Sequence, residues 1–421
     1  MISRYFPPMF AVGGKRAYRF ARYLPEFGWR AVILTGRTEG KTVDDGALRL
    51  PAGTRVERRY EPPWYREPGT RPSDGTVATP VASAPTTTGS GAPRKRMVDI
   101  PVGPEWVMQR HVVREAVRLG REEQADVVFA TSSPYAALLQ GRKVAHTLGR
   151  PLVLDLRDPW TLNFFQQCRP TWVQGFERRL EHELFSQAGR VILNCRTTLD
   201  AYRELYPDLP SDRLLAIRNA FDPADRPPAQ PIADGPIRLL HFGNCYGPRR
   251  LETMLRAMAL VRTRRPEAPE VVLENLARVG TADLELAAEL GLAAQFVHGV
   301  FVPLAEGLRR LAAADLAVLV AYGDETLYIP AKLYDYLLAR APIACIAQPG
   351  ELVDIVESCG AGRGLAPGDV EGAAALIEQV IDARSRGERA FVPNEAQLAP
   401  YSARETARAL AEVLDAVLSS R

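Results

Sequence analysis

Short apolar runs alternate with amphipathic stretches along the first half of the chain. From residue 14 to 27, apolar positions recur at three- and four-residue spacing, which predicts a helix that Gly28 ends. Strand-like apolar runs occupy residues 2–6, 30–35, 126–131, 151–156 and 190–194. Helical spacing fills residues 112–124, 135–147 and 175–187 between them. Strands that alternate with helices indicate a parallel sheet covered on both faces.

The same alternation restarts after residue 236. Strands are expected at residues 237–242, 270–274, 294–298, 316–321 and 343–347. Helices are expected at residues 250–263, 284–290, 304–313, 331–340, 350–359, 370–385 and 402–418. The pattern predicts an α/β fold of two Rossmann-like, doubly wound domains. Ligands are then expected at the carboxyl ends of the strands, in a cleft between the domains.

Two breaks in the pattern set the domain boundaries. Residues 222–236 contain five prolines and predict a semi-rigid linker. It separates an N-terminal domain, residues 1–221, from a C-terminal domain, residues 237–400. The final helix, within residues 401–421, is expected to pack back toward the N-terminal domain. Residues 62–97, rich in Pro, Gly, Thr and Ser, predict a mobile insertion that serves as a lid or binding loop, or is only a solvated excursion.

Composition narrows the class of protein. The 421 residues are 46% hydrophobic and 24% charged, as in soluble globular proteins. No apolar run reaches the ~18 to 20 residues of a membrane span, and the N-terminus lacks the apolar core of a signal peptide, so we expect a cytoplasmic protein. A net charge of +3 gives no reason to expect nucleic acid as a partner. Five dispersed cysteines and five scattered histidines lack metal-site spacing, so no metal is expected.

Lysine is rare, and its last occurrence is informative. Only five of the 53 basic residues are lysines, and Lys332 alone follows residue 143. It comes after Tyr328, Ile329 and Pro330, and Pro330 suits the first turn of a helix. Amides at that helix start, together with the lysine charge, could hold a diphosphate. Asp335, one turn further on, could accept both hydroxyls of a ribose. The alternative is a stray lysine on an exposed helix.

Gly13 and Gly14 lie between the first expected strand and the first expected helix. Glycine there lets a ligand approach the backbone, and the helix start favours a phosphate. The spacing is not GxGxxG, so the dinucleotide fingerprint is absent and a nicotinamide enzyme is disfavoured. A turn that simply needs glycine is the alternative.

A second glycine loop follows the strand at 237–242. Gly243 and Asn244 begin it, and Arg249 and Arg250 stand before the next helix. Arginines at a helix start beside a glycine loop are typical of an anion site, although they could also be solvated helix-entry charges. His241, inside the apolar strand, is interpreted as a satisfied core histidine.

Arg157 and Asp158 close the strand at 151–156. Charges at the carboxyl end of a strand are expected to face the cleft. Asp158 could position an acceptor hydroxyl or take its proton, and Arg157 could pair with Asp158 or with phosphate. A structural Asp–Arg pair at the domain rim is the alternative.

These motifs, in their order and spacing, resemble the GT-B glycosyltransferases, specifically the retaining, glycosyltransferase family 4-like (group 1) enzymes. The resemblance covers nearly the whole chain except residues 62–97. It is carried by residues 5–8 with 13–14, 24–29, 154–160, 242–244, 313–317 and 329–337.

The resemblance implies a nucleotide-diphosphate sugar as co-substrate, with no metal and no further cofactor. By analogy, the loop at Gly243 and the helix start at residues 328–332 hold the diphosphate. Asp335 matches a carboxylate that binds the ribose, His298 lies in the loop beside the nucleobase, and Gly14 matches a first-domain glycine near the phosphate and acceptor.

The chain departs from the family pattern at two places. Leu327 stands eight residues before Asp335, where many relatives carry a glutamate, which leaves Asp324 or Glu325 as its replacement. Several relatives also place a histidine where this chain has Arg157-Asp158.

The leading hypothesis is a glycosyltransferase whose acceptor is a glycan, a lipid-linked molecule or a small natural product. Trp64 and Tyr65, with the basic residues 94–96, would suit peripheral contact with the inner face of a membrane. The alternatives are a sugar-nucleotide epimerase of the same architecture and a nucleotide-binding protein without turnover.

Overall fold

The computed structural model describes residues 1–8, 13–38, 49–65, 102–245, 249–299, 301–321 and 327–420. The chain divides into two compact units. The first contains Met1–Asn219 and Ala403–Arg421, and the second contains Ala220–Ser402. The predicted insertion at 62–97 lies outside the described residues from residue 66 onward.

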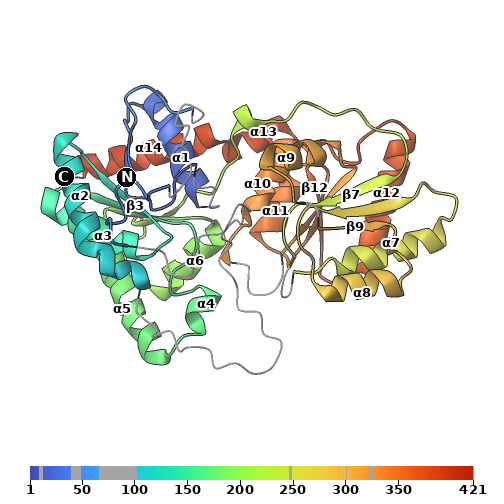
Figure 1. Cartoon of the computed structure of the whole chain (residues 1–421), viewed down its shortest axis with the longest axis horizontal. Coiled ribbons are helices and arrows are strands. Elements are labelled where there is room, and N and C mark those ends of the chain that lie inside the picture. The colour runs from blue at the N-terminus through green and yellow to red at the C-terminus, as the bar shows by residue number, and fades with distance from the viewer. Residues whose placement is uncertain are drawn as a thin grey trace. The chain divides into compact units, whose positions relative to one another are not determined.

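The strands of the first unit are all parallel (Figure 1). Two parts make up the sheet: β1 (Val32–Leu34) with β2 (Arg55–Glu57), and, in spatial order, β3 (Val128–Thr131), β4 (Leu152–Leu156), β5 (Arg190–Leu193) and β6 (Leu214–Ala216). Ile2 forms bridges to both Leu34 and Ala130 and so joins the two parts. The strand expected at residues 2–6 is reduced to this one position.

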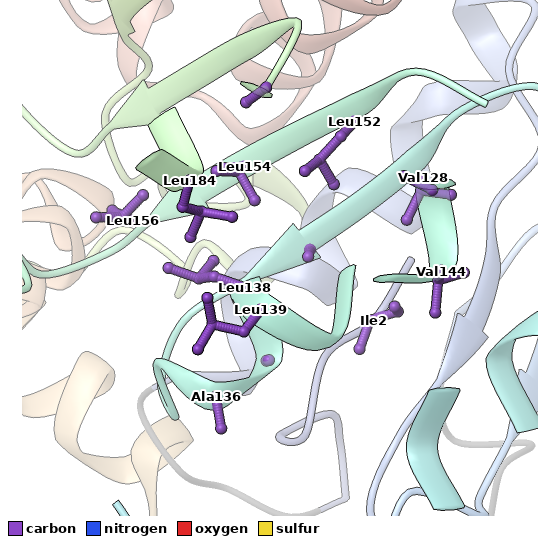
Figure 2. Close-up of a cluster of buried hydrophobic side chains, with 14 of the residues drawn as sticks. Ile2, Val128, Ala136, Leu138, Leu139, Val144, Leu152, Leu154, Leu156 and Leu184 are labelled. Carbon is purple, nitrogen blue, oxygen red and sulfur yellow. The ribbon is translucent and has the colours of Figure 1, made fainter. Parts of the chain in front are cut away.

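Helices connect these strands as the alternating pattern predicts. They are α1 (Gly14–Tyr23) with η1 (Leu24–Phe27), η3 (Pro104–Met108), α2 (Gln109–Glu122), α3 (Ala136–Leu148), α4 (Phe164–Gln167), α5 (Thr171–Gln187) and α6 (Arg196–Leu205). Figure 2 shows how the core forms: apolar side chains of β3 and β4, such as Leu152 and Leu154, lie with Leu138 and Leu139 of α3. Full burial of each such leucine stabilises the fold by roughly 1.5–3 kcal/mol.

The C-terminal helix α14 (Ala403–Ser419) packs on α1 and η1 of the first unit. Its buried face contributes Leu410 and Leu414 to a cluster with Phe20. Its exposed face adds a hydrogen bond from Trp29 Nε1 to Asp415 Oδ1 at 2.9 Å. This packing explains why residues 403–421 belong to the first unit although the second unit precedes them in the chain.

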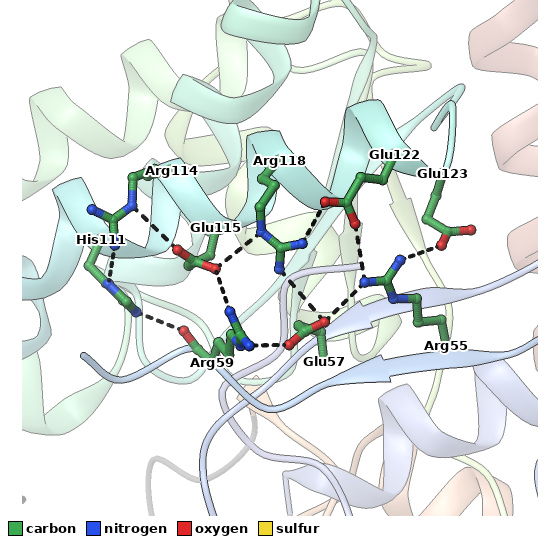
Figure 3. A network of polar contacts seen from close by, with 9 residues as sticks. All are labelled: Arg55, Glu57, Arg59, His111, Arg114, Glu115, Arg118, Glu122 and Glu123. Atoms are coloured by element: carbon green, nitrogen blue, oxygen red, sulfur yellow. Dashed lines mark hydrogen bonds and ion pairs between the residues drawn. The ribbon is translucent and has the colours of Figure 1, made fainter. Parts of the chain in front are cut away.

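A network of ion pairs ties β2 to α2 (Figure 3). Arg55 Nη1 lies 2.7 Å from Glu123 Oε1, and Arg118 Nη1 lies 2.7 Å from Glu122 Oε1. Most of these side chains reach solvent, where such a pair contributes about 0–1 kcal/mol. The network therefore orients β2 more than it stabilises the unit.

The second unit holds a six-stranded parallel sheet in the spatial order β12-β11-β10-β7-β8-β9. The strands are β7 (Ile237–His241), β8 (Val271–Asn275), β9 (Phe296–Val297), β10 (Leu316–Val320), β11 (Ile343–Ile346) and β12 (Gly362–Leu365). The helices are η4 (Pro223–Asp225), α7 (Glu252–Arg264), α8 (Thr281–Glu289), α9 (Leu304–Ala313), α10 (Ala331–Ala339), α11 (Glu351–Ser358), α12 (Val370–Ser385), α13 (Glu395–Leu398) and η6 (Ala399–Tyr401). This strand order is that of a Rossmann fold, as the sequence predicts.

The proline-rich stretch at 222–236 lies within the second unit. Arg384, in the last turn of α12, donates to the carbonyl oxygens of Pro236 and Gly235, at 2.9 and 3.1 Å. Arg389 donates to the carbonyl oxygen of Gln230 at 3.3 Å. These contacts hold the predicted linker against the unit that follows it.

A buried ion pair joins α1 to β4 in the first unit. The Arg16 guanidinium contacts both carboxylate oxygens of Asp155, at 2.7–3.0 Å, and both side chains are almost fully buried. Arg16 also donates to the carbonyl oxygen of Ile217 at 2.8 Å, and Thr131 Oγ1 donates to Asp155 Oδ2 at 2.7 Å. The ends of β3, β4 and β6 are thereby fixed around one guanidinium.

Asp155→Ala should destabilise the first unit by about 3–5 kcal/mol, because it leaves the Arg16 charge buried without its partner. Chemical denaturation followed by tryptophan fluorescence measures the loss. The matched control is Glu26→Ala, which breaks the exposed pair with Arg404 at 2.6 Å and should cost less than about 1 kcal/mol. Equal losses in the two variants would contradict the importance given to the buried pair.

Candidate functional site

The carboxyl ends of the strands in the second unit meet at one edge of its sheet. β7 lies in the middle, with β8 and β9 on one side and β10 to β12 on the other. The connection therefore reverses direction between β7 and β10, which is the switch point where doubly wound sheets bind ligands. Gly243 follows β7 there, and Lys332 lies in the first turn of α10, the helix after β10.

Lys332 lies directly against Gly243. Gly243 has φ of 134°, a conformation that favours glycine, and a Cβ atom there would lie 2.4 Å from Cε and 2.5 Å from Nζ of Lys332. Any other residue would therefore push the lysine away. The structure thus brings together two residues that the sequence predicts from separate motifs.

The His241 side chain forms a hydrogen bond with the Lys332 ammonium. Its ring is buried, and Nδ1 lies 2.7 Å from the carbonyl oxygen of Val318, so Nδ1 carries the proton and donates it. Nε2 is then an acceptor, and Lys332 Nζ lies 3.2 Å from it. Burial above all, and then the Lys332 charge, holds the pKa of His241 well below its usual value. The imidazole is therefore neutral and can accept from the ammonium.

Tyr336 fixes the end of β7 beside this pair. Its buried hydroxyl accepts from the amide of Phe242 at 2.9 Å and donates to the carbonyl oxygen of Val318 at 3.1 Å. Because Val318 belongs to β10, the carbonyl oxygen that orients His241 also receives Tyr336. Both strands at the switch point are joined through one backbone oxygen.

The remaining residues of the predicted diphosphate motif surround the start of α10. Arg249 Nη2 donates to the Tyr328 hydroxyl at 3.0 Å, which brings a second cation to this end of the sheet. Ile329 is buried, and Pro330 precedes the first helical residue. Asp335 is half-buried on the same helix, one turn beyond the lysine. Amides in a first helical turn lack intrahelical acceptors and favour an anion.

The loops after β7, β8 and β9 are connected by hydrogen bonds. Asn244 Oδ1 accepts from the amide of Arg278 at 3.2 Å, so the Asn244 side chain supports the loop. The amide of Gly299 donates to the carbonyl oxygen of Ala277 at 3.1 Å. His298 is exposed beside it, with its ring 5.7 Å from that of Phe296.

Arg250, predicted as part of the anion site, is engaged elsewhere. Its Nε lies 3.2 Å from Asp283 Oδ1 and its Nη1 lies 2.9 Å from Glu252 Oε2. Asp283 is buried and also accepts from the amide of Leu251 at 3.4 Å. The guanidinium therefore joins the starts of α7 and α8 rather than extending the cationic group.

In the first unit, Arg157 lies against the predicted glycine loop. A Cβ atom at Gly13 would lie 1.7 Å from Arg157 Nη1, so the guanidinium occupies the space that a side chain would fill. Arg157 Nε also donates to the carbonyl oxygen of Ser132, at the end of β3. Gly14 is the first residue of α1, directly beside this contact.

Asp158 stands next to Arg157 at the end of β4. Burial raises the pKa of Asp158 above its usual value, and the Arg157 charge opposes this shift. Burial likewise lowers the pKa of Arg157, against the effect of Asp158 and Asp155. The sequence left open whether the two form a structural pair, and the structure places both at the carboxyl edge of the sheet.

A buried carboxylate that the sequence analysis missed supports the turn after Asp158. Glu181 of α5 accepts from Thr161 Oγ1 at 2.5 Å, from Tyr202 OH at 2.7 Å and from Tyr206 OH at 2.8 Å. Tyr202 OH in turn accepts from the amide of Trp160 at 2.8 Å. The one available signal was a glutamate on the apolar face of a helix.

Two kinds of feature were not found in the described part of the chain. No group of three or more His, Cys, Asp or Glu side chains there could hold a metal ion. No helix among the same residues is long and apolar enough to cross a membrane.

Comparisons with known proteins agree with this architecture. Residues 13–220 match the family model described as glycosyl transferase 4-like domain. No curated protein matches the chain. HepE of Anabaena, solved in complex with UDP, has 15% identity and a TM-score of 0.62, with 98% of each chain covered.

Two further solved structures are similar over their full length. Sucrose-phosphate synthase of Thermosynechococcus elongatus has 14% identity and a TM-score of 0.64, with 100% of this chain and 99% of that chain covered. A glycosyltransferase of Rickettsia africae has 12% identity and a TM-score of 0.63, with the same coverage. The chain therefore has the predicted GT-B fold, and its residues 13–220 are similar to the glycosyl transferase 4-like domain.

Proposed function

We propose that the chain transfers a sugar, with retention of configuration and without a metal, from a nucleotide-diphosphate sugar to an acceptor. The observation that carries this proposal is the Lys332 ammonium at the switch point of the second unit, seated against Gly243 and held by a neutral His241. An ammonium has three N–H donors. His241 accepts a hydrogen bond from one of them and so keeps the ammonium at the carboxyl edge of the sheet, where doubly wound sheets bind ligands.

The reaction breaks the bond between the sugar C1 and the diphosphate, and negative charge develops on the departing nucleotide. Lys332, Arg249 and the helix-start amides of α10 would stabilise that charge, as preorganised dipoles and cations do in other transfer enzymes. In this proposal Asp335 receives the ribose hydroxyls, and the loop at His298 and Gly299 lies beside the base. Uridine is the first base to test, because HepE was solved with UDP and with UDP-glucose.

The acceptor belongs, in this proposal, to the first unit. Asp158 would position the acceptor hydroxyl or take its proton, and Arg157 beside Gly13 would orient it. A carboxylate with a raised pKa is a better proton acceptor than an ordinary one. Glycans, lipid-linked molecules and small natural products remain the acceptor classes to screen, and the anomeric configuration of the product, read by NMR, tests retention.

UDP should bind the full chain in calorimetry, and Lys332→Ala should weaken that binding by about 1.5–3 kcal/mol, or roughly 10- to 150-fold. The reason is loss of a charge-assisted contact to phosphate. Lys143→Ala is the matched control, since that lysine contacts Gln109 in the first unit. If none of the uridine, guanosine, thymidine and adenosine diphosphates binds, the donor assignment is wrong.

His241→Phe should weaken UDP binding roughly 2- to 13-fold, because it removes a hydrogen bond worth about 0.5–1.5 kcal/mol from the Lys332 ammonium. His241→Gln, which keeps a hydrogen-bonding side chain, should lose less. Binding unchanged in both variants would remove His241 from its supporting role.

His241 should also make the free energy of unfolding fall in acid. The unfolded imidazole takes up a proton near pH 6.5, whereas the folded one stays neutral because its pKa is well below that value. Unfolding is therefore favoured as pH falls below about 6.5, by up to about 1.4 kcal/mol per pH unit. Denaturation at pH 7.5 and 5.5 should show a smaller loss in His241→Phe than in the wild type. The exposed His298 provides the control, as His298→Gln.

Asp158→Asn should abolish most transfer while UDP affinity is retained, because the amide cannot take a proton. As pH falls, Asp158 takes up a proton and transfer by the wild type should decline, and this decline should begin above the ordinary carboxylate range because the pKa of Asp158 is raised. Asp200→Asn, on the exposed face of α6, is the control. Wild-type turnover in Asp158→Asn would overturn this assignment. Epimerised nucleotide sugar formed without acceptor would favour the epimerase instead.

A further inference from the structure

Large apolar side chains of the first unit are exposed at Trp64, on η3 and on α5, and the last two segments are neighbours. On α5, Trp172 is 64% exposed and Phe176 is 50% exposed. On η3, Trp106 is 41% exposed and Val107 is 58% exposed. Tryptophan is usually well buried in folded proteins, so two exposed tryptophans in neighbouring segments indicate a surface that is covered by something else.

The exposed residues of α5 form one stripe. Trp172 and Phe176 are four residues apart and Arg179 follows three residues later, so all three lie on the same helix face. The opposite face carries the buried Val173 and Leu184. The core of the unit therefore uses the other side of α5 and leaves this stripe unused.

The charge beside the stripe is positive. Arg178 and Arg179 are exposed, and among the described residues neither forms an ion pair. The carboxylates of the same helix segment, Glu177 and Glu181, are buried and hydrogen-bonded. The outer face of this half of α5 thus presents aromatic rings and guanidinium groups, and the next acid on the same face, Glu183, is paired with Arg142 at 2.8 Å.

The segment around η3 repeats the same arrangement. Arg110 is exposed one turn after Trp106 and Val107, and no ion pair engages it among the described residues. Glu105 is bound by the buried Arg4. Glu115, further along α2, is held by arginines of the network in Figure 3.

A direct hydrogen bond joins the two segments. The amide of Val102, just before η3, donates to Glu177 Oε1 at 2.6 Å, and Glu177 directly follows Phe176. We call the combined set the aromatic–arginine surface, defined as Trp106, Val107, Arg110, Trp172, Phe176, Arg178 and Arg179.

We propose that the aromatic–arginine surface docks the protein on an anionic lipid bilayer. Tryptophan and phenylalanine side chains favour the interfacial layer of a bilayer, and guanidinium groups bind lipid phosphates. Basic residues at such a surface are attracted to anionic lipids. Exposed rings beside arginines that form no ion pair among the described residues meet both requirements. A neutral or basic protein partner would offer these arginines no negative charge.

The inference does not depend on the donor site, but it connects to the acceptor side. The helix that carries Trp172 and Phe176 also carries Glu181, which holds Thr161, three residues after Asp158. A bilayer against the outer face of α5 would therefore lie behind the same helix that supports the Asp158 turn. Such placement suits a lipid-linked acceptor.

Sedimentation of the full chain with vesicles tests the proposal. We expect binding to vesicles of phosphatidylcholine with 30% phosphatidylglycerol (on the order of the anionic content of a charged membrane surface), and much weaker binding to phosphatidylcholine alone or in high salt. The double variant Trp172→Ser/Phe176→Ser should lower the partition coefficient at least ~tenfold. Arg178→Gln/Arg179→Gln should lower it about fivefold per arginine.

Matched substitutions in the second unit provide the controls. Phe301→Ser removes a ring that is 72% exposed, and Arg363→Gln removes an exposed charge; neither should change vesicle binding. UDP binding is measured in every variant. A variant that loses UDP binding as well has a folding defect, and absence of UDP binding in the wild type would count against the donor assignment. Neither result is confused with a loss of vesicle binding alone. Absent binding to anionic vesicles, equal binding to neutral ones, or partition unchanged by both double variants would overturn the proposal.

Discussion

The contact between the Lys332 ammonium and the neutral imidazole of His241 determines what the second unit can hold at its switch point. The Lys332 ammonium needs a hydrogen-bond acceptor that leaves its positive charge available. A carboxylate would form an ion pair with the ammonium and so compete with a phosphate. Imidazole accepts a hydrogen bond and leaves the charge intact. Its tautomer is fixed by the carbonyl oxygen of Val318, 77 residues away along the chain. Backbone geometry in β10 thus orients the cation, and Gly243 leaves room for it.

The first unit also holds charged side chains at the carboxyl edge of its sheet, but with carboxylates as their partners. Its carboxyl edge gathers the buried Arg16 and Asp155 with the half-buried Arg157 and Asp158. Arg16 and Asp155 satisfy each other and the strand ends around them, so they act as structure. Arg157 and Asp158 are adjacent in sequence, and burial shifts the pKa of each toward its neutral form. Perturbed groups of this kind cluster where chemistry takes place.

Much of this architecture could be read from the sequence, because apolar periodicity is a local property. The helices α9 and α12 occupy the residues that their spacing predicts. β12 was missed because Gly362-Arg363-Gly364 offers neither an apolar run nor a branched side chain. The expected strand at residues 2–6 is reduced to bridges at Ile2, and beyond it Ser3 Oγ donates a local hydrogen bond to the carbonyl oxygen of Tyr5.

Less of the candidate site could be predicted from the sequence, because its main contacts join residues that are far apart along the chain. Lys332 stood out because lysine is rare in this chain, but no local pattern reveals that His241, 91 residues earlier, accepts a hydrogen bond from it. Arg250 was predicted in the anion site, and no local pattern reveals that Asp283, 33 residues later, forms an ion pair with it. The arginine-rich composition has one useful result. Lys332 is the only lysine in Ala220–Ser402, so an amine-acylating reagent would label the lysines of that unit at a single atom. Mass spectrometry of the labelled protein would then report directly whether a ligand covers Lys332.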